Sequence, residues 1–200
     1  MIRKKTGWSA VAALALSLCT SAAFGQEKQQ EITVHLDPSR TEIRWTLSDV
    51  LHTVHGTFKL KGGVITFDPA TGAAEGELLV DLESGESGNK TRDRLMRKNV
   101  FQTDTYPQAI YHPEKISGTL QPGAAQQLTV DGTFTIHGKD HPLRLIVQAQ
   151  LTGSNQVVAT TRFAVPYVAW GMKDPSTFVL RVGKQADVDV TARGYAEGLP

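Results

Sequence analysis

Apolar and polar residues alternate along most of the chain from Ile32 onward. Ile43, Trp45 and Leu47, for example, are each separated by one polar residue. Successive side chains of a strand point to opposite faces of a sheet, so this period predicts strands that each carry one apolar face. Roughly nine or ten such stretches follow one another and are joined by short turns rich in glycine, asparagine and proline. This order predicts an antiparallel meander.

A sheet of this length has to bury its apolar face, and closure into a barrel buries that face and also removes the exposed edges. The sequence therefore predicts an all-β protein with an extended antiparallel β-barrel over residues 32–195; a two-sheet sandwich is the alternative. Turns are expected at Gly62-Gly63 and at residues 68–72, where glycine and proline cluster. A last short strand is expected over residues 178–182, before the strand that contains Ala186.

The inward phase of the predicted strands includes several small residues, namely Gly56, Gly76, Gly132, Ala149, Ala159 and Ala186. Small inward residues can leave a cavity along the axis of a barrel. The alternative is that they only allow the strands to coil and to pack closely.

One long segment, residues 88–107, does not alternate. It carries five basic residues between Lys90 and Lys98. Its apolar residues Leu95, Met96, Val100 and Phe101 have helical spacing. We therefore expect one short basic helix that covers one end of the barrel as a lid, with its apolar face toward the interior.

The N-terminus has the features of a secretory signal peptide: a basic start, an apolar run from Trp8 to Leu18 and small residues up to Gly25. We predict residues 1–25 to be this signal peptide, residues 26–31 a disordered lead-in, and residues 196–200 a C-terminal tail. A membrane anchor is the alternative, although the apolar run is shorter than a spanning helix needs. Cleavage near Gly25 would remove Cys19, the single cysteine, and would direct the protein to the periplasm or outside the cell.

The charge balance of the expected mature chain excludes some partners. Residues 26–200 contain 18 basic and 20 acidic residues, a formal charge of −2 with histidine neutral. Nothing in this overall balance favours a nucleic-acid or an anionic-lipid partner.

Two pairs of histidines, His52 with His55 and His137 with His141, have spacings that would reach one metal ion if they lay on a helix. They are expected in a strand start and in a hairpin turn instead, so no metal ligand and no catalytic residue is assigned. A histidine-dependent metal-binding enzyme on the same barrel remains an alternative.

Five stretches in series resemble the YceI-like family of bacterial secreted proteins. They are residues 36–45, 54–58, 63–69, 88–93 with Phe101 and residues 106–107, and 130–138 with Pro142. The resemblance covers nearly all of the mature chain and implies a lipocalin-like barrel whose apolar interior holds a long amphiphile such as a polyisoprenoid or a quinone tail. The chain departs from the family pattern at Arg40, in its more basic helix and in residues 167–175.

With this ligand class, the expected function is a periplasmic or secreted carrier that is not an enzyme, needs no cofactor besides a bound isoprenoid or quinone lipid, and makes transient contact with a membrane. A ligand-free interaction module with a filled barrel is another alternative. The candidate lining residues are the large apolar ones on the inward phase and on the helix: Ile43, Trp45, Leu47, Val54, Phe58, Leu78, Val80, Leu82, Met96, Phe101, Val130, Phe134, Leu145, Val147, Phe163 and Trp170. For each of them, plain core packing is the alternative role. Arg92, Arg94 and Arg97 are candidates to bind the head group, because arginine suits bidentate recognition of phosphate. The alternative for each of them is a solvated position on the surface of the helix.

Overall fold

The computed structural model describes residues 30–48, 53–153, 155–177 and 181–199. Within these ranges the chain forms nine strands, and all of their pairings are antiparallel. The strands are β1 Ile32–Leu36, β2 Glu42–Ser48, β3 Thr53–Phe67, β4 Ala74–Glu86, β5 Gln108–Ser117, β6 Gln126–Ile136, β7 Lys139–Thr152, β8 Gln156–Val165 and β9 Ala186–Glu197.

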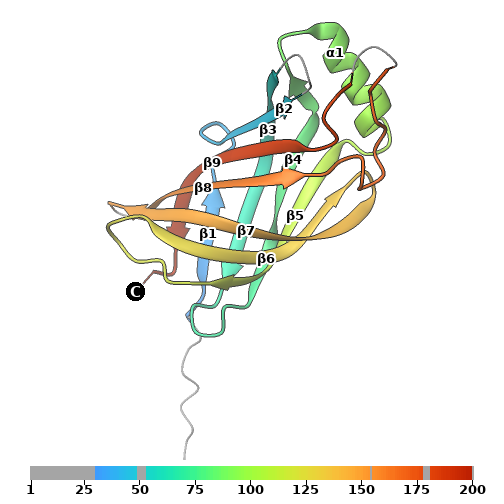
Figure 1. The fold of residues 1–200 in the computed structure, drawn as a ribbon. Helices are drawn as coiled ribbons and strands as arrows, with labels where there is room; N and C mark the ends of the chain where they lie inside the picture. Colours follow the sequence, from blue (N-terminus) through green and yellow to red (C-terminus); the bar gives the residue numbers. More distant parts are fainter. Residues whose placement is uncertain (1–29, 49–52, 154, 178–180, 200) are drawn as a thin grey trace, which may run out of the picture.

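The strands from β2 to β9 pair in sequence order, and β9 pairs back with β2, so these strands close into a barrel (Figure 1). The barrel prediction is confirmed, and the sandwich alternative is wrong. β9 ends at Glu197, two residues beyond the expected end of the barrel, and pairs there with Thr33 of β1. Ala196, expected in a C-terminal tail, is fully buried.

β1 and β2 together occupy the gap between β3 and β9. β2 pairs with β3 from Thr53 to Phe58, and β1 pairs with the far end of the same strand, Val64–Phe67. A turn at residues 37–40 separates the two strands, and the Asp37 carboxylate accepts a hydrogen bond from the backbone N–H of Ser39 (2.8 Å). The long β3 thus holds two short strands end to end in the barrel wall.

The expected turn at Gly62-Gly63 is wrong, because β3 runs through it without a break. The pairing register between β3 and β4 shifts between Leu60 and Gly62, which lets the strand bend where a turn was expected. A Cβ atom at Gly63 would collide with the side chain of Leu78, so glycine is required there for close packing. The turn at residues 68–72 is confirmed: the Asp68 carboxylate accepts bonds from the Ala70 N–H and the Thr71 hydroxyl.

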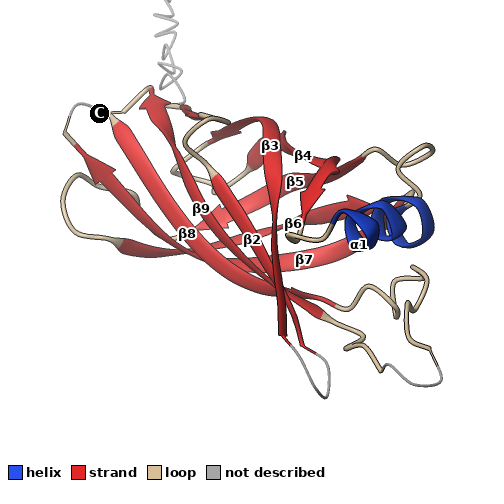
Figure 2. Cartoon of the chain, turned by 90° about the horizontal axis from the view of Figure 1, so that it is seen from above, coloured by secondary structure: helices blue, strands red, loops and turns tan. Residues whose placement is uncertain are grey.

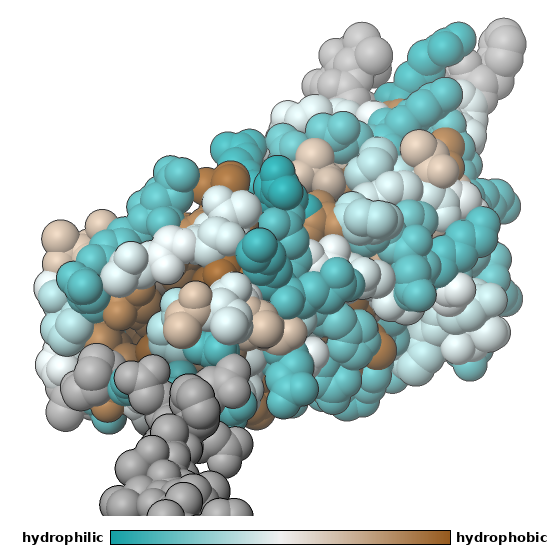
Figure 3. Space-filling model, turned by 90° about the horizontal axis from the view of Figure 1, so that it is seen from below, coloured by the Kyte–Doolittle hydropathy of each residue, from teal (hydrophilic) through white to brown (hydrophobic). Residues whose placement is uncertain are grey.

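The two ends of the barrel differ. At the end near the C terminus, the interior is filled by Ile32, Phe67, Ile116, Leu128, Leu151 and Ala196, all buried. The helix α1 (Lys90–Leu95) lies at the opposite end, together with the loop that follows β8 (Figure 2). The outer surface is largely hydrophilic, with hydrophobic side chains visible in recesses (Figure 3).

Several expectations fall on residues outside the described ranges. They are the signal peptide, most of the lead-in, His52 and residues 178–180 of the last short strand. Among the described residues, no helix has both the length and the apolar character needed to cross a bilayer.

Candidate ligand-binding cavity

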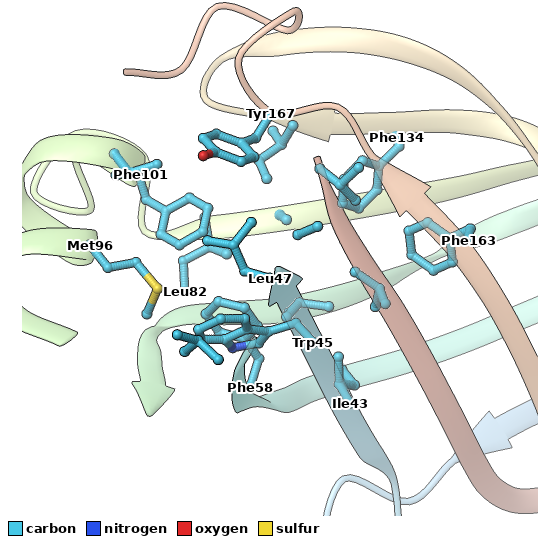
Figure 4. Close-up of a pocket in the computed structure, with 18 of the residues that line it drawn as sticks. Ile43, Trp45, Leu47, Phe58, Leu82, Met96, Phe101, Phe134, Phe163 and Tyr167 are labelled. Carbon is cyan, nitrogen blue, oxygen red and sulfur yellow. The ribbon is translucent and has the colours of Figure 1, made fainter. Parts of the chain in front are cut away.

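A cavity of about 840 Å³ lies in the half of the barrel that is nearer to the helix. Its wall comes from the inward faces of β2 to β9 and from the helical segment. Figure 4 shows aromatic and aliphatic side chains from these elements pointing into one common space. Thirteen of the sixteen predicted lining residues contribute to this wall: Ile43, Trp45, Leu47, Val54, Phe58, Leu78, Val80, Leu82, Met96, Phe101, Phe134, Leu145 and Phe163.

Val130, Val147 and Trp170 are not part of the wall. Val130 pairs with Ile116, and Val147 pairs with Leu128, so both valines belong to the filled half of the barrel. Trp170 lies in the loop after β8, where its ring stacks on His141 with centroids 4.1 Å apart. The alternation in the sequence identified the inward face correctly but carried no information on depth along the barrel.

Two tyrosines that were not predicted, Tyr111 and Tyr167, line the cavity, and their hydroxyls are bonded to backbone carbonyls. The Tyr111 hydroxyl donates to the carbonyls of Val130 (3.1 Å) or Leu143 (3.2 Å). The Tyr167 hydroxyl donates to the Gly183 carbonyl (2.6 Å). Burial raises the pKa of Tyr111 above its usual range and raises the pKa of Tyr167 to about 12. Both groups therefore stay neutral, and the wall they form is apolar.

The glycines on the inward phase do not create the cavity. The indole of Trp45 lies over Gly56, and the ring of Tyr111 lies over Gly132, so that a Cβ at either glycine would collide with an aromatic ring. These positions confirm the close-packing alternative. Of the small inward residues named above, only Ala186 contributes to the described cavity wall. The cavity lies in the half of the barrel nearer to the helix, which the side chains of the strands leave unfilled.

The segment expected to be a helix forms α1 and then a π-helical stretch, η1 (Met96–Phe101). Asn89 begins it: its side-chain oxygen accepts hydrogen bonds from the backbone N–H groups of Thr91 and Arg92, both 3.0 Å. The four apolar residues expected to close the interior, Leu95, Met96, Val100 and Phe101, all line the cavity. The ring of Phe101 makes an edge-to-face contact with the ring of Phe58 in β3, with ring centroids 5.7 Å apart.

The three candidate arginines have three different positions. Arg92 lines the cavity and is held by Ser87, whose hydroxyl and carbonyl accept bonds of 2.7 Å each from its guanidinium. The same hydroxyl donates to the buried carboxylate of Asp93. Arg97 is not among the lining residues and donates to backbone carbonyls of β4, at 3.1 Å for Gly85. Arg94 is exposed and also lies outside the lining, so only Arg92 is placed to contact a bound molecule.

The rim of the cavity opposite the helix was not predicted. Lys173, Asp174, Pro175, Ser176 and Thr177, in the loop after β8, face Asn89, Thr91 and Asn99 of the helical segment across the opening. The Ser176 N–H donates to the Asp174 carboxylate (2.9 Å), and these bonds from Ser176 lower the pKa of that carboxyl. The departure of residues 167–175 from the family pattern was the signal that could have identified this loop.

None of the five histidines that the structure describes is part of the cavity wall. His137 is in the β6–β7 turn with its ring 4.7 Å from that of Tyr106, and burial lowers the pKa of His141 beside Trp170. Among the described residues, no group of three or more histidine, cysteine, aspartate or glutamate side chains is arranged to hold a metal ion.

Comparison with known proteins agrees with this architecture. The chain is similar to the crystal structure of Burkholderia cenocepacia BcnA, with a TM-score of 0.65, 18% identity, and coverage of 79% of this chain and 98% of that chain. It is also similar to the structure of a polyisoprenoid-binding domain from Saccharophagus degradans, with a TM-score of 0.64, 16% identity, and coverage of 85% and 100%. A third similar structure, the YceI protein of Campylobacter jejuni, has a TM-score of 0.58 and 16% identity over 74% of this chain and 88% of that chain.

At these identities the structural matches establish the fold only. A search of curated protein sequences gives no significant match. The model of the YceI-like domain matches residues 35–193, which is most of the chain, and the protein therefore belongs to the YceI-like family.

Proposed function

We propose that this protein binds and carries one long apolar amphiphile, a polyisoprenoid, quinone or related lipid, with the tail in the barrel. The observation that carries the proposal is the cavity of about 840 Å³, walled by apolar side chains and reached past a polar rim. Its size falls within the range of small-molecule sites, about 300–1,000 Å³. The similar domain from S. degradans is described as polyisoprenoid-binding, which supports the same ligand class.

The chemistry of the wall suits a tail. Each methylene group moved from water into such a wall gains about 0.8 kcal/mol, so ten methylenes gain roughly 8 kcal/mol before the costs of association. An apolar wall provides little orientation, so the direction of the ligand depends on the rim. Arg92 is fixed there by Ser87 and, with Lys173, offers positive charge to a phosphate or a carbonyl oxygen of a head group.

Binding is a better account of this cavity than catalysis. Among the described lining residues, the charged ones are Arg92, Lys173 and Asp174, and all three belong to the rim. The two tyrosine hydroxyls are bonded to backbone carbonyls. A ligand-free interaction module would need a filled barrel, and the cavity disfavours it.

The site of action we propose is the periplasm or the exterior of the cell. The basis is the basic start, apolar run and small-residue end of residues 1–25 in the sequence. N-terminal sequencing of the protein from its native host should begin near Gln26; an intact Met1 in the mature protein would contradict export by this route.

The test of the carrier function is to extract the natively expressed protein with organic solvent and to identify bound lipid by mass spectrometry. Val188→Trp places a larger side chain in the cavity, so this variant should copurify with less lipid. Arg193→Trp places the same side chain on the exposed face of the same strand and should retain the wild-type amount. The proposal fails if no lipid copurifies and an apolar fluorescent probe finds no site.

A further inference from the structure

Positive charge is concentrated at the end of the barrel where the cavity opens. The two stretches of sequence that include the rim residues, 86–108 and 165–186, contain eight basic and four acidic residues, a formal charge of +4. The remaining residues from 26 onward contain ten basic and sixteen acidic residues, a formal charge of −6. Residues 26–200 are therefore slightly acidic as a whole, with a formal charge of −2, but have one cationic end.

Of the eight cations at this end, only Lys184 pairs with a carboxylate among the described residues, that of Asp174 (4.0 Å). On the barrel wall, Arg44 pairs with Glu42 (2.6 Å) and Arg144 pairs with Asp131 (2.5 Å). The helical cations Lys90, Arg94 and Lys98 and the rim residue Lys173 are exposed and form no ion pair with any residue that the structure describes. Lys59 and Lys115 of the wall are also exposed and, within the described part of the chain, unpaired, but they lie on two separate strands, whereas the helical cations are clustered on one short segment. The charge of the helical cations and of Lys173 is available to an external partner.

An exposed apolar residue lies among these cations. Leu95, on the helix between Arg94 and Met96, keeps 47% of its surface exposed and also lines the cavity. An exposed apolar residue among basic residues on a helix is typical of surfaces that insert into the interface of a bilayer, where the cations contact anionic head groups.

We propose that this end of the barrel docks on a bilayer that contains anionic phospholipid. Lys90, Arg94, Lys98 and Lys173 contact the head groups, and Leu95 enters the interface. The opening of the cavity then faces the bilayer. The purpose of this contact rests on the proposed carrier function, because a bound tail could pass between barrel and bilayer without exposure to water. The cations occur on both sides of the opening that leads to the apolar cavity, an arrangement that fits a broad lipid surface better than an acidic protein.

The test is cosedimentation with phosphatidylcholine vesicles, with and without about one third phosphatidylglycerol. The wild-type protein should bind the anionic vesicles only, and binding should weaken as NaCl is raised from about 0.05 to about 0.3 M because the charges are screened. The variant K90E/K98E should lose at least about thirtyfold in affinity, roughly a factor of five for each cation removed. The control K59E/K115E changes two exposed lysines of β3 and β5 by the same net charge and should bind within about twofold of wild type.

Equal binding of both variants, or equal binding of neutral and anionic vesicles, would overturn the proposal. Binding to polyglutamate as strong as to the vesicles would also overturn it, since the partner would then be an acidic polypeptide. Lipid content, measured by native mass spectrometry, separates this proposal from the carrier function. If the protein contains bound lipid but does not bind anionic vesicles, only the docking proposal is contradicted. If it binds anionic vesicles but contains no bound lipid, only the carrier function is contradicted.

Discussion

The depth of the cavity can be tested by shortening it from within. On β9, every second residue from Ala186 to Ala192 lines the cavity, a series that spans about 20 Å along the strand. Val190 is the third of these four residues counted from the opening, so a larger side chain there obstructs the deep part of the cavity and leaves the part near the opening free. We therefore expect Val190→Phe to select against long tails.

The magnitude follows from the volume that the new ring occupies. Phenylalanine adds about four heavy atoms to valine and should displace about four methylenes of a tail that reaches this depth; at about 0.8 kcal/mol each, the loss is about 3 kcal/mol, or roughly 200-fold in affinity. A ligand whose tail ends before Val190 does not contact the new ring, so its affinity for Val190→Phe should stay within about twofold of its affinity for wild type.

The assay is displacement of a bound apolar fluorophore by a series of unbranched alcohols of increasing chain length. Thr191→Phe adds the same ring to the next residue of β9, outside the cavity lining, and should leave the whole series unchanged. If Val190→Phe weakens short and long alcohols equally, or neither of them while remaining folded, the tail does not extend along β9 and the reasoning is refuted.

Three further predictions concern stability. Arg97→Ala should lower the free energy of unfolding by about 1–3 kcal/mol, because carbonyls of β4 lose their donor, whereas Arg94→Ala should stay within about 0.5 kcal/mol of wild type in urea titrations. Gly56→Ala should lower the free energy of unfolding by about 1–3 kcal/mol and change tryptophan fluorescence, because the new methyl group collides with the indole of Trp45. Gly62→Ala is the control, since no atom lies within reach of its new Cβ, and it should change neither quantity. Similar effects of the two substitutions would contradict this packing. Tyr167 has a pKa of about 12 in the folded protein, whereas a tyrosine in the unfolded chain ionises near pH 10. The stability that this difference provides is complete below pH 10 and is lost as the pH rises toward 12. Urea titrations at pH values of about 9 and about 11.5 should therefore show a smaller loss of stability for Tyr167→Phe than for wild type, and an equal loss would exclude this contribution of Tyr167.

Much of the candidate site could be predicted from residue order because burial repeats every two residues in a strand. Ile43, Trp45 and Leu47 all line the cavity, as expected from their shared phase. The lid residues followed from a different period, since Leu95 and Phe101 belong to the one segment with helical spacing. The rim loop with Lys173 and Asp174 was missed because a loop has no period that marks its direction.

The arginines of the helix show a second limit. Arg92, Arg94 and Arg97 are chemically equivalent in sequence, yet one lines the cavity, one is exposed and one binds the backbone of β4. Their roles depend on which acceptors the neighbouring strand leaves unpaired. The register of β3 against β4 shifts near Thr57 and Lys59, and this irregularity cannot be read from local pattern.

The sequence alone was sufficient for most of the strands, the antiparallel order, the closed barrel and the basic helix, because each depends on local alternation or on the need to bury one face of a sheet. It was not sufficient for β3, which continues through the turn expected at Gly62-Gly63. Only the tertiary structure decided the depth at which each inward residue lies. Val130 and Leu145 are paired neighbours with the same phase, but Leu145 borders the cavity and Val130 belongs to the filled core. Phase determines inside or outside, whereas depth depends on the tilt and register of all the strands together.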